Sequence, residues 1–160
     1  MRKMKNQIRR RILILSILLL FIIIAVTSLL PRYCTICDYS SIYEITNMYP
    51  HSINAFTEGL YFSSGFLYES VGYYGSSRLL QYTDIENGTY VELFQPDESI
   101  FLEGAAELNG KIYLLTWHNN EIIIINSETH ELIESVNYNR EGWGLTTDGE
   151  HLIASDGSSN

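Results

Sequence analysis

"FLEGAAELNGKIYLLT", residues 101–116, has a pattern that occurs twice more in the chain and indicates how it folds. Residues 56–70 are "FTEGLYFSSGFLYES" and residues 141–155 are "EGWGLTTDGEHLIAS". Each copy has a glycine followed by an apolar residue, a turn glycine four or five residues later, and a second apolar run. Two short runs of this kind, separated by a turn glycine, predict a β-hairpin.

The spacing of the copies predicts what the hairpins belong to. The turn glycines Gly65, Gly110 and Gly149 are 45 and 39 residues apart. A period of about 40 to 50 residues in a chain of short strands is typical of propeller blades. Beyond Asp38 no window has a convincing helical period. We therefore expect an all-β repeat in which each copy begins a new sheet.

The repeat also aligns three side chains that precede its glycine. Glu58, Glu103 and Trp143 occupy equivalent positions in the three copies. In a propeller the first strand of each blade lines the central channel, so these side chains would meet at one mouth. A solvated or turn-bonding glutamate is the alternative, and the alignment alone leaves both interpretations open.

Three segments resemble a known family: "YPHSINAFTEGLYF" (49–62), "LEGAAELNGKIYLLTWH" (102–118) and "EGWGLTTDGEHLIASDGSS" (141–159). In this order and spacing they are similar to the plant- and bacterial-type glutaminyl-peptide cyclotransferases. The resemblance implies a five-bladed β-propeller, of which residues 42–160 would form about two and a half blades. It also implies an enzyme that converts the N-terminal Gln of peptides to pyroglutamate and releases ammonia, with no cofactor and no catalytic metal.

The resemblance implies roles for five residues. Glu103 matches the catalytic acid/base carboxylate of the family, whereas Phe56, Trp117 and Trp143 match aromatic residues of the substrate pocket. Glu58 stands where the family commonly has glutamine, a departure that would alter how the substrate amine or amide is held. For Trp117, which closes the apolar run "IYLLT", packing in the core is the alternative.

The cyclisation reaction that the resemblance implies explains why a single carboxylate would lie among aromatic residues. An α-amine with a pKa of about 7.7 to 8.0 must lose a proton as it attacks the side-chain amide. The departing nitrogen must gain one, so a single positioned carboxyl can carry the proton between them. Removal of water by Trp117 and Trp143 would raise the pKa of Glu103 toward the range where it can do both.

The N-terminal part predicts a membrane anchor. Residues 1–11 hold six of the ten Lys and Arg residues, and residues 12–30 are nineteen uncharged, mainly apolar residues, enough to cross a bilayer as a helix. The basic tail should remain cytoplasmic and the C-terminal domain should be extracytoplasmic. Secretion after cleavage of a signal peptide is the alternative.

Residues 31–41 would form a juxtamembrane linker that contains Cys34 and Cys37. In an oxidising compartment this pair could form a disulfide within a chain or between two chains, whereas a zinc site or a redox motif would need partners that the sequence lacks. From Asp38 onward, nineteen acidic residues face three basic ones, which makes nucleic acid and anionic lipid poor partners. One explanation of this negative charge is solubility. The alternative is that it attracts peptides with a positively charged amino terminus.

The length sets a further expectation. Five blades of about 40 to 45 residues need about 200 residues or more, whereas the sequence has 112 from Tyr49 onward. The resemblance places further pocket residues, an Asn, a Trp and a Lys, in later blades. We therefore expect a truncated product that is inactive by itself. The alternative is a non-catalytic, membrane-tethered propeller fragment that acts as a binding or self-assembling module, such as a homodimer.

Overall fold

The computed structural model describes residues 43–159, and all the strands of this part lie in one compact unit, Asn47–Asn160. The predicted basic tail, the apolar segment 12–30, and Cys34 and Cys37 lie outside the described residues. Within residues 43–159, no helix has the length and apolar character needed to cross a membrane. For the described residues the expected all-β architecture is confirmed, because all their regular elements are β-strands.

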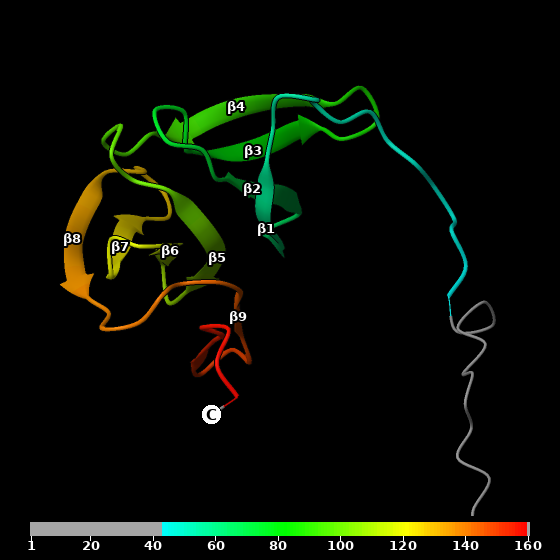
Figure 1. The fold of residues 1–160 in the computed structure, drawn as a ribbon. Helices are drawn as coiled ribbons and strands as arrows, with labels where there is room; N and C mark the ends of the chain where they lie inside the picture. The colour runs from blue at the N-terminus through cyan, green and yellow to red at the C-terminus, as the bar shows by residue number, and fades with distance from the viewer. Residues whose placement is uncertain (1–42, 160) are drawn as a thin grey trace, which may run out of the picture. The chain divides into compact units, whose positions relative to one another are not determined.

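Two four-stranded antiparallel sheets follow one another, each with its strands in sequence order (Figure 1). The first contains β1 (Thr57–Ser63), β2 (Phe66–Val71), β3 (Arg78–Asp84) and β4 (Thr89–Phe94). The second contains β5 (Leu102–Leu108), β6 (Lys111–Thr116), β7 (Glu121–Asn126) and β8 (Leu132–Asn137). A separate hairpin follows, with β9 (Leu145–Thr147) and β10 (Leu152–Ala154).

The predicted turns join the first two strands of each unit. Ser64 and Gly65 have φ values of 50° and 86°, and Asn109 and Gly110 have 52° and 73°. Two consecutive residues with positive φ form the tight hairpin turn that matches the twist of the flanking strands, and Asn and Gly adopt this conformation at low cost. The third hairpin has a longer turn, which includes Gly149 with a φ of 95°.

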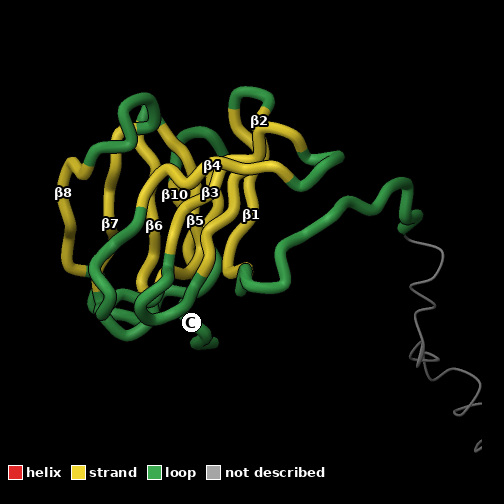
Figure 2. Tube along the Cα trace, turned by 90° about the horizontal axis from the view of Figure 1, so that it is seen from above, coloured by secondary structure: helices red, strands yellow, loops and turns green. Residues whose placement is uncertain are grey.

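The first strands of the units, β1, β5 and β9, contact one another in succession. Figure 2 shows β1 and β5 side by side. Glycines allow this approach: a Cβ on Gly59 would lie 2.9 Å from the backbone nitrogen of Ala105, and one on Gly104 would lie 2.4 Å from that of Leu145. The Gly104 N–H donates a hydrogen bond of 2.8 Å to the carbonyl of Trp143. The repeated glycine is therefore where one unit packs on the next, an arrangement consistent with a propeller.

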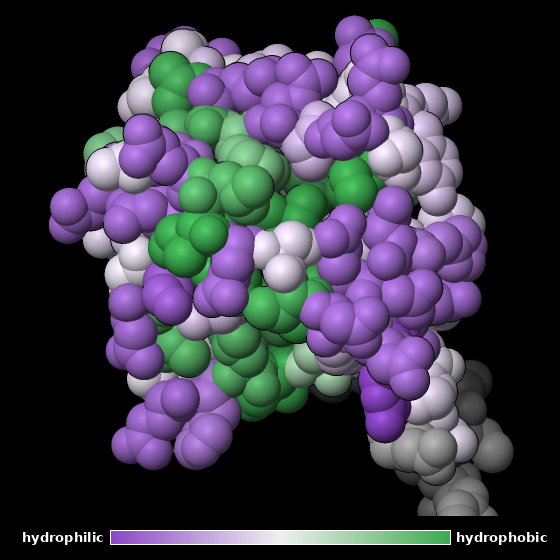
Figure 3. Space-filling view, turned by 90° about the vertical axis from the view of Figure 1, so that its left-hand side faces the viewer, coloured by the Kyte–Doolittle hydropathy of each residue, from purple (hydrophilic) through white to green (hydrophobic). Residues whose placement is uncertain are grey.

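The hydrophobic core lies between the two four-stranded sheets, because both contribute to a single cluster of buried side chains. Its members are Tyr68, Leu79, Ile100, Leu102, Ala105, Ile112, Leu114, Ile123 and Ile125. Burial of these apolar surfaces is the main force that holds the sheets together. Figure 3 shows that hydrophobic side chains also form a band between polar areas on one outer face.

Candidate active site

A cavity of about 620 Å³ opens where β1 and β5 begin and β2 and β6 end. Seven residues line it: Phe56, Glu58, Tyr73, Tyr74, Phe101, Glu103 and Trp117. The volume lies within the range of small-molecule sites, and the lining of five aromatic residues and two carboxyl groups is typical of such sites.

The aromatic residues form a continuous wall. The Phe56 ring packs edge-to-face on Tyr73 and on Phe101, with ring centroids 6.3 Å apart in both pairs. Phe101 in turn contacts Tyr74 at 5.3 Å and Trp117 at 5.5 Å. Edge-to-face contacts of this kind fix ring orientations beyond what burial alone achieves. The wall is thus a preformed apolar surface beside the two carboxyl groups.

The carboxyl groups of Glu58 and Glu103 are hydrogen bonded to each other. Burial, the negative charge and hydrogen bond of Glu58, and the charge of Glu141 together raise the pKa of Glu103 to about 8. Burial also raises the pKa of Glu58, while its hydrogen bond to Glu103 acts in the opposite direction. Glu103 therefore keeps a proton near neutral pH, which an ordinary glutamate does not.

The backbone explains why these two side chains meet. Each glutamate comes directly before a glycine at which β1 and β5 approach each other. The Ser70 hydroxyl adds a hydrogen bond of 2.5 Å to the carbonyl of Glu103. Gly72 leaves the space that the site needs, because a Cβ there would lie 2.3 Å from the Phe101 ring and 2.7 Å from Cγ of Glu58. The Glu-Gly pair is repeated at the start of β1 and β5, and the two strands approach closely at its glycines. Both carboxyl groups therefore enter one cavity.

Four of the five sequence-predicted site residues line this cavity: Phe56, Glu58, Glu103 and Trp117. The fifth, Trp143, occupies the equivalent backbone position, but its side chain is outside the lining and 47% exposed. Its indole N–H donates to the Glu141 carboxyl at 3.3 Å. The other Glu141 oxygen lies 3.4 Å from Nδ1 of His118, whose ring stacks on Trp117. Trp143 thus adjoins the site through Glu141.

Three lining residues were not predicted: Tyr73, Tyr74 and Phe101. The repeat contains a signal for Phe101, because "FTEG" and "FLEG" align it with Phe56. Their backbones also make equivalent bonds, since the Gly72 N–H donates to the Phe56 carbonyl at 2.9 Å and the Trp117 N–H to the Phe101 carbonyl at 3.0 Å. Tyr73 and Tyr74 come from the connection between β2 and β3, which has no counterpart in the repeat pattern.

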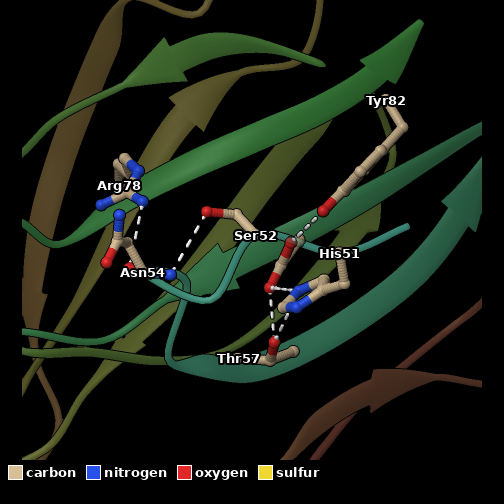
Figure 4. Close-up of polar contacts among 7 residues, drawn as sticks. His51, Ser52, Asn54, Thr57, Arg78 and Tyr82 are labelled. Atoms are coloured by element: carbon tan, nitrogen blue, oxygen red, sulfur yellow. Dashed lines mark hydrogen bonds and ion pairs between the residues drawn. The ribbon is translucent and has the colours of Figure 1, made fainter. Parts of the chain in front are cut away.

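A second polar cluster surrounds the fully buried carboxyl of Glu69 on β2 (Figure 4). Its Oε1 lies 2.9 Å from Nε2 of His51 and accepts a bond of 2.5 Å from the Thr57 hydroxyl. Its Oε2 accepts a bond of 2.7 Å from the Tyr82 hydroxyl. Because His51 and Thr57 flank the segment that carries Phe56, this cluster holds one wall of the cavity to the first sheet.

Loss of the Tyr82 hydroxyl is expected to destabilise the fold. Tyr82→Phe leaves Oε2 of Glu69 buried without its donor, which should lower the free energy of unfolding by about 1 to 3 kcal/mol. Tyr90→Phe is the matched control, because Tyr90 is 37% exposed and packs edge-to-face on Tyr82. Urea denaturation monitored by fluorescence measures both variants. Equal losses would show that Glu69 does not depend on this bond.

Within the described residues, no three His, Cys, Asp or Glu side chains group as the ligands of a metal ion would. The groups in the cavity that can hold a ligand are therefore two carboxyls, two phenols and the aromatic faces. Such a site fits a small molecule with an apolar surface and a hydrogen-bond donor or a positive charge.

Comparison with known proteins agrees with this geometry. The glutamine cyclotransferase family matches residues 19–160. A glutaminyl-peptide cyclotransferase of Arabidopsis thaliana is 32% identical over 118 residues, which cover 72% of this chain and 37% of the relative. The crystal structure of Myxococcus xanthus glutaminyl cyclase is 33% identical and superposes with a TM-score of 0.57, covering 68% of this chain and 45% of that one.

The chain therefore spans less than half the length of either relative. The match nevertheless includes the three repeat copies and every residue that lines the cavity. This chain belongs to the glutamine cyclotransferase family.

Proposed function

We propose that the protein carrying this site is a glutaminyl-peptide cyclotransferase. The substrate is a peptide or protein with a free N-terminal Gln, whose α-amine attacks the side-chain amide carbon to form pyroglutamate and release ammonia. Family membership supports this function, and the names of the two relatives point to the same activity. These matches favour an enzyme over a non-catalytic binding module.

One observation carries the proposal: the pKa of Glu103 is raised to about 8 in an aromatic cavity. This value matches that of a free α-amine, about 7.7 to 8.0. Proton exchange between the two groups is then close to balanced in energy, and general acid–base catalysis is most effective under that condition. The wall of Phe56, Phe101 and Trp117 would exclude water and pack against the aliphatic part of the glutamine side chain.

We also propose that the two sheets and the following hairpin are successive blades of a five-bladed propeller. Contacts from β1 to β5 to β9 support this arrangement. The apolar segment 12–30 and its basic flank support a membrane anchor with the catalytic domain on the extracytoplasmic side. There the acidic surface would attract the positively charged amino termini of peptides.

A mass-spectrometric assay tests the function. The protein that carries this site in a complete five-bladed propeller is incubated with a peptide that begins with Gln, and loss of one ammonia is followed over time against the spontaneous rate. Two control peptides, one with an acetylated N-terminus and one that begins with Asn, should not react, because the first lacks the nucleophile and the second would form a strained four-membered ring. A rate equal to the spontaneous one would contradict the proposal.

A further inference from the structure

Glu69 is a fully buried carboxyl that the proposed reaction does not use. Its Oε1 contacts Nε2 of His51 and the Thr57 hydroxyl, whereas its Oε2 contacts the Tyr82 hydroxyl (Figure 4). Burial of a carboxyl is costly unless such bonds compensate for the water it loses. Two of these partners come from residues 51–57, the segment that leads into β1, so the bonds tie this segment to the first sheet.

Phe56 lies between these two ties, and its position depends on them. Its side chain is 55% exposed, so burial contributes little to holding the ring. On the C-terminal side the chain is already fixed, because the Phe56 carbonyl accepts a bond of 2.9 Å from the Gly72 N–H and β1 begins. On the N-terminal side the bond from His51 to Glu69 is 2.9 Å, whereas Arg78 reaches the Asn54 carbonyl only at 3.5 Å. His51 is therefore the stronger tie there.

The position of Phe56 matters because its ring borders two spaces. Phe56 and Tyr73 line both the active-site cavity and a second cavity of about 370 Å³. A shift of the Phe56 ring would change the size of the active-site cavity and would remove part of the aromatic wall beside Phe101. The surface available to a glutamine side chain thus depends on the segment that carries Phe56.

We propose that His51 is a positioning residue of the active site: its bond to Glu69 holds the segment that carries Phe56, and thereby the wall on which the substrate packs. This inference rests on the proposed function and extends the site to a residue outside the cavity lining. His51 acts through Phe56 and has no part in the proton transfers of Glu103. Its loss should therefore weaken substrate binding more than it slows the chemical step.

Steady-state kinetics of the complete propeller protein tests the proposal. His51→Ala should raise KM for a peptide that begins with Gln about 10-fold and lower kcat less than about 3-fold. His51→Gln should restore most of the wild-type KM, because its side-chain N–H can donate to the same oxygen. His151→Ala is the matched control: His151 lies 3.4 Å from the Asp148 carboxyl in an exposed turn, and its loss should leave KM unchanged.

A second variant separates positioning from stability. Tyr82→Phe removes a donor from the same carboxyl of Glu69, but Tyr82 belongs to β3 and not to the segment that carries Phe56. It should reduce stability more than His51→Ala, because its bond is buried whereas the His51 side chain is 46% exposed. It should nevertheless raise KM less. The opposite order of the two KM values would overturn the proposal, because KM would then follow stability alone.

Fluorine-19 NMR reports on the ring without turnover. 4-Fluorophenylalanine in place of Phe56 should give a resonance displaced from its unfolded-chain value, because the ring packs edge-to-face on Tyr73 and Phe101. In His51→Ala this resonance should move toward the unfolded-chain value, and His51→Gln should reverse the change.

The two measurements distinguish this inference from the proposed function. Wild-type turnover with an unchanged resonance in His51→Ala would overturn the inference alone. A resonance that moves while KM stays the same would also overturn it, because the ring position would then not affect binding. The expected change in resonance without any wild-type turnover would instead overturn the proposed function, and with it the role of His51 in binding this substrate.

Discussion

Glu103→Gln is expected to reduce kcat for an N-terminal glutaminyl peptide by about 100- to 10,000-fold. Glutamine has nearly the same shape and can still donate a hydrogen bond to Glu58, so the contact between the two side chains should survive. It cannot release a proton to the leaving nitrogen, and this transfer is the step assigned to Glu103. Ammonia release measured under saturating peptide gives kcat directly.

The same substitution should increase stability at alkaline pH. The folded-state pKa of Glu103, about 8, lies above its ordinary value of 4.5. The folded protein therefore binds this proton more tightly than the unfolded chain, and this contribution declines as the pH rises from 4.5 to 8. Glu103→Gln removes the decline. At pH 8.5 we expect a gain of about 1 to 2 kcal/mol, less than the full shift implies because the carboxyl is partly solvated.

Thermal or urea unfolding at pH 5 and pH 8.5 separates the two effects. The difference between variant and wild type should be small at pH 5 and should favour the variant at pH 8.5. A variant that loses both activity and stability at each pH would indicate a damaged fold rather than a missing acid. A variant that keeps the wild-type kcat would show that Glu103 is not the proton donor.

The sequence predicted part of the site: the repeat aligned Glu58 with Glu103, and the family resemblance supplied Phe56 and Trp117. Phe56, Glu58 and Glu103 belong to the "FTEG" and "FLEG" motifs, and the structure places all three in the cavity lining. Trp117 follows the second strand of its hairpin, and its backbone bond to Phe101 brings it to the same place. These residues are close in space because they are close to a hairpin in the sequence: each hairpin brings the start of its first strand beside the end of its second strand.

Other features depend on contacts that no local pattern specifies. Tyr73 and Tyr74 lie in a connection whose path is set by the Ser77 hydroxyl, which bonds the backbone of Tyr73 and of Leu102. Glu69 sits in "LYESV", where alternation could place a charged residue on either face, and only its three bonding partners explain its burial. The repeat predicted that Glu58, Glu103 and Trp143 would meet at one mouth, but only the structure shows that the Trp143 side chain lies outside the cavity lining.

Gly104→Ala is expected to have the largest effect on stability. The added Cβ would lie 2.4 Å from the backbone nitrogen of Leu145 and 2.5 Å from the carbonyl oxygen of Trp143, and neither backbone atom can move without shifting β9. The same shift would break the bond from the Gly104 N–H to Trp143. Overpacking together with a lost buried hydrogen bond should cost about 3 kcal/mol or more.

Gly144→Ala is the control for this change, because Gly144 occupies the equivalent position in the third copy of the repeat. Its Cβ would meet the Ser155 hydroxyl at 3.1 Å, an exposed group that accepts a hydrogen bond of 2.9 Å from the Gly144 N–H and would have to shift slightly. We expect a loss of about 1 kcal/mol, because the exposed bond to Ser155 is weakened while no backbone segment has to move. Urea unfolding compares the two variants. Equal losses would mean that the repeated glycine serves the conformation of each strand, whereas the expected difference would locate its role in the packing of one sheet on the next, where Glu58 and Glu103 are brought together.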